Sequence, residues 1–486
     1  MKLEENKLSI SYYIKYIFKG GFIVSLGEII VKALGILLLP VFTVYLSPTD
    51  FGAIAMVYSL VSFLSLFYNP GIISASQRLY FEVDSEDEKR EIIGSSYMFF
   101  LVFPIFFSLI IVLVGPYLSS LLFTDFNFYP YGYIAVFLAF FNQPKRIWIL
   151  LLSIQHRIQY TTIYVVGGAL LSTLISLILI VKMGYGPLGK VLALIPSAII
   201  VFVISNKTVF SYTKGIWSFK KLKEILIYGF PLIFAIWSYE ILFIADRFLL
   251  EGMIGSEQLG IYSLAYQVSQ IPIFIAIGIR KIWNPIFYEN MKNKTYDNVK
   301  KLVSIYLIFI TFIHVSIILF SKELILLLVD ERFYGAIPVI SIITSGIFFS
   351  SLLTISNSFL GYENKFKTTS KIASIAALLN IVLNIVLIPI LGISGAAFAT
   401  MISYMLYFGA SAFMVRSFNE LLKVHQLLLI CIGFLLITVI GVLMFDKPQF
   451  SGLEIATKMG VISLFILLII KLNIFKISQL LKFIKG

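Results

Sequence analysis

The chain has 486 residues, of which 59% are hydrophobic and 13% are charged, and its formal net charge at pH 7 is +13. Soluble domains carry about a quarter charged residues, so this composition excludes a soluble enzyme or binding domain and indicates an all-α polytopic membrane protein. Cys431 is the single cysteine, which excludes an intramolecular disulfide.

The first 20 residues hold four lysines, with Glu4 and Glu5 between them, and no small-residue cleavage site follows. We interpret residues 1–20 as a cytoplasmic amphipathic leader. Apolar stretches of about 20 residues, the length that crosses a bilayer as a helix, then recur to the C-terminus. They predict fourteen spans, near residues 22–46, 52–74, 95–115, 131–153, 161–181, 186–205, 225–249, 258–283, 302–320, 337–358, 368–388, 393–415, 426–445 and 455–474.

Lys and Arg are unevenly divided between the two sides of this topology. The side that holds both termini has 28 of them, the other side has 7, and three lie inside spans. Because basic residues are retained in the cytoplasm, the bias predicts two cytoplasmic termini and an even number of spans in the cytoplasmic membrane. The positive charge therefore reflects topology first and attraction to anionic membrane lipids second, and it gives no reason to expect nucleic-acid binding.

The sequence resembles itself at a separation of just over 200 residues, and such repeats are typical of transporters. Apolar, glycine-rich segments can match by composition alone, but three matches with one topology favour a true repeat. The matching pairs are Leu46–Ile54 with Ile254–Tyr262, Gln155–Thr162 with Glu363–Thr369, and Gly186–Gly189 with Gly392–Gly395.

The repeat predicts two pseudo-symmetric lobes of six helices. Six is an even number, so both lobes begin on the same side of the membrane and are parallel repeats. The expected regions are the leader 1–20, an N-terminal lobe 21–206, a cytoplasmic linker 207–224, a C-terminal lobe 225–416, and two appended helices with a cytoplasmic tail, 417–486.

Several stretches, in order and spacing, resemble the polysaccharide-biosynthesis flippases of the Wzx or RfbX type. They are Gly35–Thr43 running into Tyr45–Gly52, Asp246–Leu249 leading into Leu259–Tyr266, Trp283–Phe287, and Asn380–Asn384 followed by Gly392–Ala397. The resemblance covers the first twelve spans. It implies the superfamily that also contains MATE multidrug extruders and lipid II flippases, a V-shaped pair of six-helix bundles, and a substrate made of a sugar chain on undecaprenyl pyrophosphate.

Ionisable residues inside a bilayer are costly and usually face a cavity or pair with one another. Glu28 and Lys32 have the i, i+4 spacing and order of a favourable helical ion pair. The alternative to a functional role is that they simply neutralise each other against a neighbouring helix. The repeat places Lys32 opposite Glu240, so we expect these two residues on facing walls of a central cleft.

A pyrophosphate head group needs cations, and arginine provides a bidentate fork for phosphate oxygens. For Arg78 and Arg280 the default is a topological role, and Asp246 and Arg247 lie near a helix end where side chains can reach the interface. The expected substrate-binding residues are Lys32, Arg78, Arg146, Arg247 and Arg280. The expected ion-coupling or gating residues are Glu28, Glu240 and Asp246.

Two features that could suggest a nucleotide or metal site are incomplete. Gly184–Lys190 has the glycine and lysine spacing of a phosphate-binding loop, but Val191 replaces the required Ser or Thr. The three histidines are dispersed, so no metal, cofactor or catalytic residue is expected. An H⁺ or Na⁺ gradient is then the expected energy source.

These observations predict a flippase that moves lipid-linked oligosaccharide repeat units by alternating access, beside other polysaccharide assembly proteins. The alternative is a MATE-type ion-coupled exporter of drugs or organic cations, which would have cavity acids without excess cavity cations. A membrane polymerase or ligase would need a long outer loop with catalytic groups. No such loop is found, and the outer loop Gly115–Pro130 is largely apolar with a single acid, Asp125, so an enzyme is not expected.

Overall fold

The computed structural model describes residues 10–415, 433–437 and 452–471. Every regular element in these ranges is helical, and they contain no strand. Backbone contacts divide the chain into two compact units, residues 1–260 and 261–486. The all-α class predicted from composition is confirmed, whereas the predicted lobe boundaries stay predictions.

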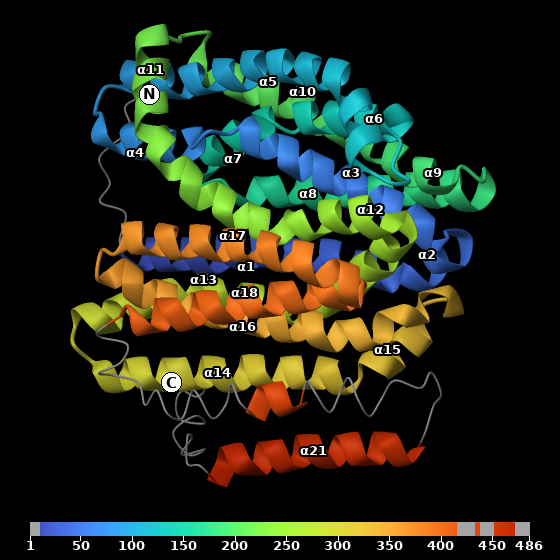
Figure 1. Cartoon of the computed structure of the whole chain (residues 1–486). Coiled ribbons are helices and arrows are strands. Elements are labelled where there is room, and N and C mark those ends of the chain that lie inside the picture. Colours follow the sequence, from blue (N-terminus) through green and yellow to red (C-terminus); the bar gives the residue numbers. More distant parts are fainter. Residues whose placement is uncertain (1–9, 416–432, 438–451, 472–486) are drawn as a thin grey trace. The chain divides into compact units, whose positions relative to one another are not determined.

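The first unit is a set of helices that lie side by side (Figure 1). They are α1 (Ile10–Leu37), α2 (Leu39–Tyr45), α3 (Pro48–Phe67), α4 (Ile72–Glu82), α5 (Glu86–Leu122), α6 (Phe128–Phe141), α7 (Pro144–Ile154), α8 (Gln159–Leu177), the π-helix η1 (Ile178–Lys182), α9 (Gly186–Leu192), α10 (Leu194–Thr213), α11 (Phe219–Gly229), the 3₁₀-helix η2 (Phe230–Leu232) and the first part of α12 (Ile233–Ser269).

The second unit begins within α12. Its further helices are α13 (Ile271–Lys292), α14 (Tyr296–Leu319), α15 (Ser321–Leu328), the 3₁₀-helix η3 (Glu331–Ala336), α16 (Ile337–Tyr362), α17 (Phe366–Leu391), α18 (Ile393–Phe413) and α21 (Gly452–Lys471). Helix α16 is the centre of this unit, since it contacts α13, α14, α17 and α18.

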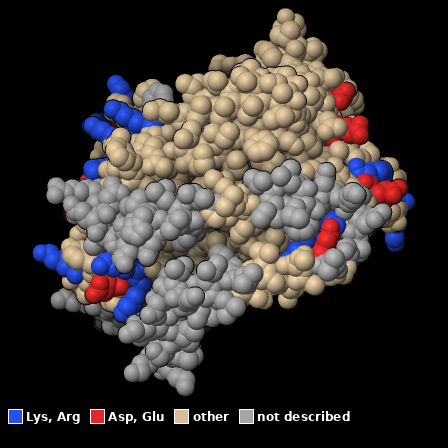
Figure 2. Space-filling model, turned by 60° about the horizontal axis from the view of Figure 1, so that its bottom comes forward, with Lys and Arg blue, Asp and Glu red and all other residues tan. Residues whose placement is uncertain are grey.

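Nine helices of the described ranges are long and apolar enough to cross a membrane, or ten if the bent pair α1 and α2 is one span. The multi-pass prediction is therefore confirmed, and the total of fourteen stays a prediction. The expected thirteenth span, 426–445, lies mostly outside the described residues, and α21 falls on the fourteenth. On the face drawn in Figure 2, the upper tan surface shows charged side chains only near its left and right edges.

Several spans are broken where proline begins a new helical segment. The first span bends by 41° between Leu37 and Leu39, and Pro40 follows at once. The fourth is interrupted at Asn142 and Gln143 before Pro144. Proline has no N–H to donate, and its fixed φ suits the first turn of a helix, so a break just before it leaves no extra donor unpaired.

The internal repeat is visible in the backbone. His156 and Asn364, 208 residues apart, both have φ of +55°. At the next residues, the Arg157 N–H donates to the Leu152 carbonyl at 2.7 Å, and the Lys365 N–H donates to the Leu360 carbonyl at 2.9 Å. The two helix ends thus have the same left-handed cap at the offset of the predicted repeat, and the two-lobe organisation stays a prediction.

The region expected as the linker contains the start of an amphipathic helix. Ser218 caps α11 by accepting the Lys221 N–H. Ile225 of α11 is fully buried in an apolar cluster with Ile92 of α5 and Trp148 of α7. This segment is therefore attached to the first unit by the apolar face of its helix.

In the second unit, α15 and α21 are joined by two ion pairs, of which the Lys458–Glu323 pair is buried on both sides. The Lys322 ammonium donates to Glu454. In the reverse direction, the Lys458 ammonium donates to both carboxylate oxygens of Glu323, at 2.7 and 2.8 Å. Lys322 and Lys458 are almost completely buried. Removal of one partner would leave a charge buried, which costs about 3–5 kcal/mol.

We predict that Lys458→Ala lowers the free energy of unfolding by about 3–5 kcal/mol, because Glu323 loses its buried partner. The measurement is thermal or denaturant unfolding in detergent, with the exposed Lys371→Ala as the matched control. The double exchange Lys458→Glu with Glu323→Lys should recover part of the loss. Equal stability of Lys458→Ala and Lys371→Ala would contradict this assignment.

Candidate functional site

Six of the eight residues expected to act on substrate or ions interact in three pairs within the first unit, and Arg78 and Arg280 do not belong to these pairs. In α1, Glu28 and Lys32 interact electrostatically; Glu28 is half-buried and Lys32 is exposed. A Cβ on nearby Gly27 would lie 2.3 Å from the Thr162 methyl group, so α1 lies directly against α8 here. The i, i+4 pair expected from the sequence is present, while its role stays a prediction.

Glu240 of α12 interacts electrostatically with Arg146 of α7, and both side chains are half-buried. Arg146 lies in the first turn of α7, directly after the break in the fourth span, and Lys145 precedes it. The sequence comparison had related Glu240 only to Lys32 and had found no neighbour for it. In the structure its charge interacts with that of Arg146, which lies in the same unit.

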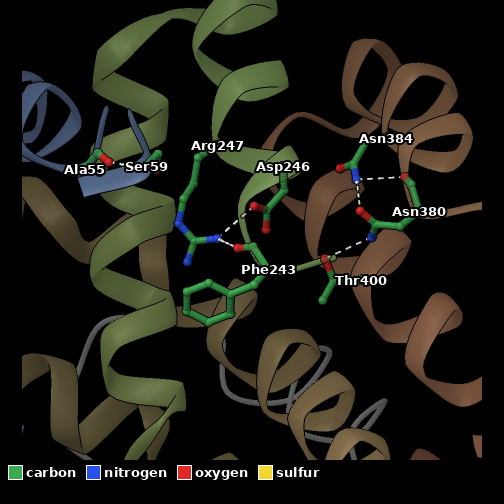
Figure 3. Close-up of polar contacts among 8 residues, drawn as sticks. All are labelled: Ala55, Ser59, Phe243, Asp246, Arg247, Asn380, Asn384 and Thr400. Carbon is green, nitrogen blue, oxygen red and sulfur yellow. Dashed lines mark hydrogen bonds and ion pairs between the residues drawn. The ribbon is translucent and has the colours of Figure 1, made fainter. Parts of the chain in front are cut away.

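Asp246 and Arg247 form a buried ion pair in α12, with the Arg247 Nη1 donating to Asp246 Oδ1 at 2.8 Å (Figure 3). The same nitrogen donates to the Phe243 carbonyl, and the guanidinium lies 4.8 Å from the centre of the Phe243 ring. Asp246 is 0% exposed and Arg247 8%. Both side chains are therefore buried within the protein, where each offsets the other's desolvation, and their role in transport stays a prediction.

Arg78 of α4 lies outside the spans and is exposed. Its Nε donates to Glu82 at 2.7 Å, and its guanidinium lies 4.6 Å from the Tyr228 ring of α11. The hydrogen bond to Glu82 raises the pKa of Arg78 above its ordinary value, so the group stays a cation at any physiological pH. An exposed pair of this kind contributes little to stability, which leaves the cation available to an anion. Arg280 lies in α13, and its side chain is outside the described part of the chain.

The two copies of the first repeated motif are packed against each other, and the sequence did not indicate this. A Cβ on Gly52 would lie 1.9 Å from the Ser256 carbonyl oxygen, and a Cβ on Gly260 would lie 1.8 Å from the Pro48 carbonyl oxygen. Gly260 follows Gly52, and Ser256 follows Pro48, by the same 208 residues. We call this reciprocal approach the glycine contact. It lies at the helix ends that the charge bias predicts to face outward.

Sequence reasoning also missed Glu251, a fully buried acid of α12. Its carboxylate accepts hydrogen bonds from three consecutive backbone N–H groups, those of Thr124, Asp125 and Phe126. In the sequence, Asp125 stands out only as the single acid of its loop. Nothing in the spacing indicates that a carboxylate 125 residues further along binds that loop.

The second unit contains a buried polar cluster of its own (Figure 3). The Asn384 amide of α17 donates to the carbonyl and side-chain oxygens of Asn380, at 2.8 and 3.1 Å. The Asn380 amide reaches the Thr400 hydroxyl of α18 at 3.5 Å. These asparagines belong to the stretch that carried the family resemblance, to which no role had been given. They join α17 to α18 by side-chain hydrogen bonds within an apolar unit.

Metal ligands are not grouped in the part of the chain that the structure describes. It contains no set of three or more His, Cys, Asp or Glu side chains that could hold a metal ion.

Comparison with protein families identifies the chain. The model of the family described as "Polysaccharide biosynthesis protein" matches residues 17–291, which is more than half of the sequence. The chain belongs to this family. The MatE family model also matches, over residues 231–386. Both matches agree with the flippase resemblance and with its superfamily.

Two curated relatives match this member of the polysaccharide biosynthesis family over part of their length. An uncharacterized membrane protein of Methanocaldococcus jannaschii is 26% identical over 252 residues, 51% of this chain and 48% of the relative. The capsular polysaccharide biosynthesis protein CapF of Staphylococcus aureus is 30% identical over 190 residues, 38% of this chain and 47% of CapF. The chain thus spans about half the length of the curated relatives it matches.

Solved structures share the fold over most of the chain. The lipid II flippase MurJ, in an inward closed conformation, superposes with a TM-score of 0.71 at 19% identity, covering 92% of this chain and 98% of MurJ. An inward-facing MATE family multidrug resistance transporter gives 0.65 at 13% identity, covering 81% and 96%. At these identities the likeness establishes the fold, which is that of the superfamily expected from the sequence.

We predict that Arg247→Ala lowers the free energy of unfolding by about 3–5 kcal/mol, because the buried Asp246 carboxylate loses its guanidinium. The control is Arg332→Ala, since Arg332 pairs with Asp330 at the surface and should cost at most about 1 kcal/mol. Unfolding of the two variants in detergent is compared with the unaltered chain. A loss no greater for Arg247→Ala than for Arg332→Ala would show that the buried pair is not a structural requirement.

Proposed function

We propose that the protein is a flippase for undecaprenyl-pyrophosphate-linked oligosaccharide repeat units in surface polysaccharide biosynthesis. It acts in the cytoplasmic membrane, with both termini in the cytoplasm, and works by alternating access. The lipid-linked head group binds from the cytoplasmic side, that side closes, and the head group leaves outward while the lipid tail stays in the bilayer.

The observation that carries this proposal is the glycine contact. Two repeated motifs, one on each half of the pseudo-symmetric chain, meet through bare backbone at the helix ends expected to face outward. A contact without side chains can be tight and can also separate without extracting a buried side chain. It is the kind of two-state closure that alternating access requires.

The intramembrane cations favour a phosphate-bearing substrate over an organic cation. Lys32, Arg146 and Arg247 lie within predicted spans, and each interacts with an acid in the state described. A pyrophosphate can compete with those carboxylates for the cations, whereas a cationic drug would be repelled by them. The family match and the resemblance to CapF favour the same choice. A MATE-type exporter is the rival supported by the MatE match.

Deletion of the gene is the direct test. Unflipped lipid-linked repeat units should accumulate on the cytoplasmic side, and surface polymer should disappear. Normal surface polymer in the deletion strain would refute the assignment. Normal polymer together with increased sensitivity to cationic drugs would favour the MATE-type exporter.

We predict that Arg146→Gln reduces flipping about ten- to a hundredfold when it replaces the normal gene, because a charge-assisted bond to phosphate contributes roughly 1.5–3 kcal/mol. Accumulated lipid-linked repeat units are quantified in membranes at matched expression. The control is Arg157→Gln, which removes an exposed cation at a helix end. Equal accumulation in the two variants would remove Arg146 from the binding site.

We predict that an H⁺ or Na⁺ gradient drives the cycle, with Glu240 as the coupling acid next to Arg146. Flipping in proteoliposomes should depend on pH, sodium or membrane potential, and Glu240→Gln should abolish that dependence. Glu257→Gln, which removes an exposed acid from the same helix, should keep it. Transport that is indifferent to all three gradients would contradict ion coupling while leaving the flippase assignment intact.

A further inference from the structure

Glu251 organises the loop between α5 and α6. Its Oε2 accepts the Thr124 N–H at 3.0 Å, and its Oε1 accepts the Asp125 and Phe126 N–H groups at 2.9 and 2.6 Å. Oε1 also accepts the Ser256 hydroxyl at 3.1 Å. A carboxylate that accepts several N–H bonds at once makes strong, charge-assisted hydrogen bonds.

A second set of bonds connects the same two segments in the opposite direction. The Asp125 carboxylate of the loop accepts the Ser256 N–H of α12 at 2.9 Å. The Thr124 hydroxyl donates to the Gly252 carbonyl at 3.2 Å. These bonds meet α12 where it is kinked, since Gly255 has φ of +86° and ψ of 172°. A φ in this region favours glycine, and the kink frees backbone groups that these side chains satisfy.

This network adjoins the glycine contact through Ser256. Its hydroxyl and N–H bind Glu251 and Asp125, while its carbonyl oxygen faces Gly52. One residue therefore belongs both to the backbone closure and to the carboxylate network. Separation of α3 from α12 at this point requires Ser256 to move, and any such movement strains the bonds to Glu251.

We infer that Glu251 is a positioning residue for the transport cycle: its carboxylate binds loop 123–127 to the kink of α12 and holds the outward-facing end closed. We call this set of bonds the outer latch. It rests on the alternating access of the proposed function and is independent of which glycan is carried. The state with the latch formed is the one described here, and outward release requires it to break.

The three loop N–H groups determine how strongly Glu251 stabilises the closed state. When the latch opens, these N–H groups exchange their hydrogen bonds to the carboxylate for hydrogen bonds to water. The carboxylate therefore stabilises the closed state only by the difference in free energy between the two kinds of hydrogen bond. Each hydrogen bond to a charged group favours the native arrangement by a factor of about ten to a hundred in the equilibrium constant. Glutamine at this position can accept with one oxygen only, and its amide would direct a donor at the Thr124 N–H.

The test measures how often the outward-facing end opens. Ala55 follows Gly52 by about one turn on the same side of α3 and is 8% exposed, so we expect a cysteine there to react from outside only when the helices packed against this side separate. The full chain with Cys431→Ser and Ala55→Cys is expressed in cells and treated from outside with a membrane-impermeant maleimide. The rate of labelling is compared with and without Glu251→Gln, with Glu257→Gln as the matched control from the same helix.

The expected result is a rate about tenfold or more higher in Glu251→Gln and unchanged in Glu257→Gln. Equal rates in the two variants would overturn the latch. Should Glu251→Gln fail to reach the membrane, Asp125→Asn replaces it, because Asp125 is exposed and binds the same Ser256; its rate should also rise, and an unchanged rate overturns the inference. No substrate is involved, so failure here leaves the flippase assignment to be decided by glycolipid accumulation.

Discussion

The reciprocal approach of two backbones at Gly52 and Gly260 is a tight packing constraint within the first unit. Either glycine would place a Cβ within 2 Å of the opposing carbonyl oxygen if it carried a side chain. The arrangement is reciprocal, as at a two-fold symmetric interface. Gly52 meets Ser256, and their counterparts in the other copy of the motif, Gly260 and Pro48, meet in the same way. A duplicated sequence thus supplies both halves of one contact. The kink at Gly255 and the hydrogen bonds of Glu251 both adjoin this contact at Ser256.

Charge within the first unit follows a consistent pattern. Glu28 interacts with Lys32, Arg146 with Glu240, and Asp246 with Arg247. An ionised group in an apolar medium costs several kcal/mol unless it has a partner, so pairing allows these residues to exist in the absence of a ligand. It also allows an anionic ligand to take the place of an acid in the pair at modest cost. The same groups can therefore stabilise the empty protein and bind its substrate.

Much of the fold could be predicted from the sequence because the bilayer constrains it so strongly. Apolar stretches of the required length located the described spans. The sequence repeat paired Gln155–Thr162 with Glu363–Thr369, and in the structure His156 and Asn364 of these stretches have the same left-handed backbone conformation. Composition could not indicate where the chain breaks within the bilayer, as it does at Gln143, because such breaks depend on neighbouring helices. Nor could it predict that Asp246 and Arg247 are buried.

The candidate site was only partly accessible to sequence reasoning. Intramembrane acids and bases stand out in an apolar chain, so Glu240 and Arg146 were selected individually. Their electrostatic interaction joins residues that are 94 positions apart in the sequence, which no local pattern encodes. Glu251 was overlooked because its partners are backbone N–H groups, which every residue except proline possesses.

The most direct measurement is flipping of an undecaprenyl-pyrophosphate-linked oligosaccharide in proteoliposomes by three forms of the protein. They are the unaltered chain, Gly52→Ala, and the control Gly167→Ala, where an added Cβ meets no atom within 4 Å. The account predicts equal rates for the unaltered chain and Gly167→Ala. Overpacking of about 1–3 kcal/mol should lower the rate of Gly52→Ala by about tenfold. Equal flipping by all three forms, or none by the unaltered chain, would contradict it.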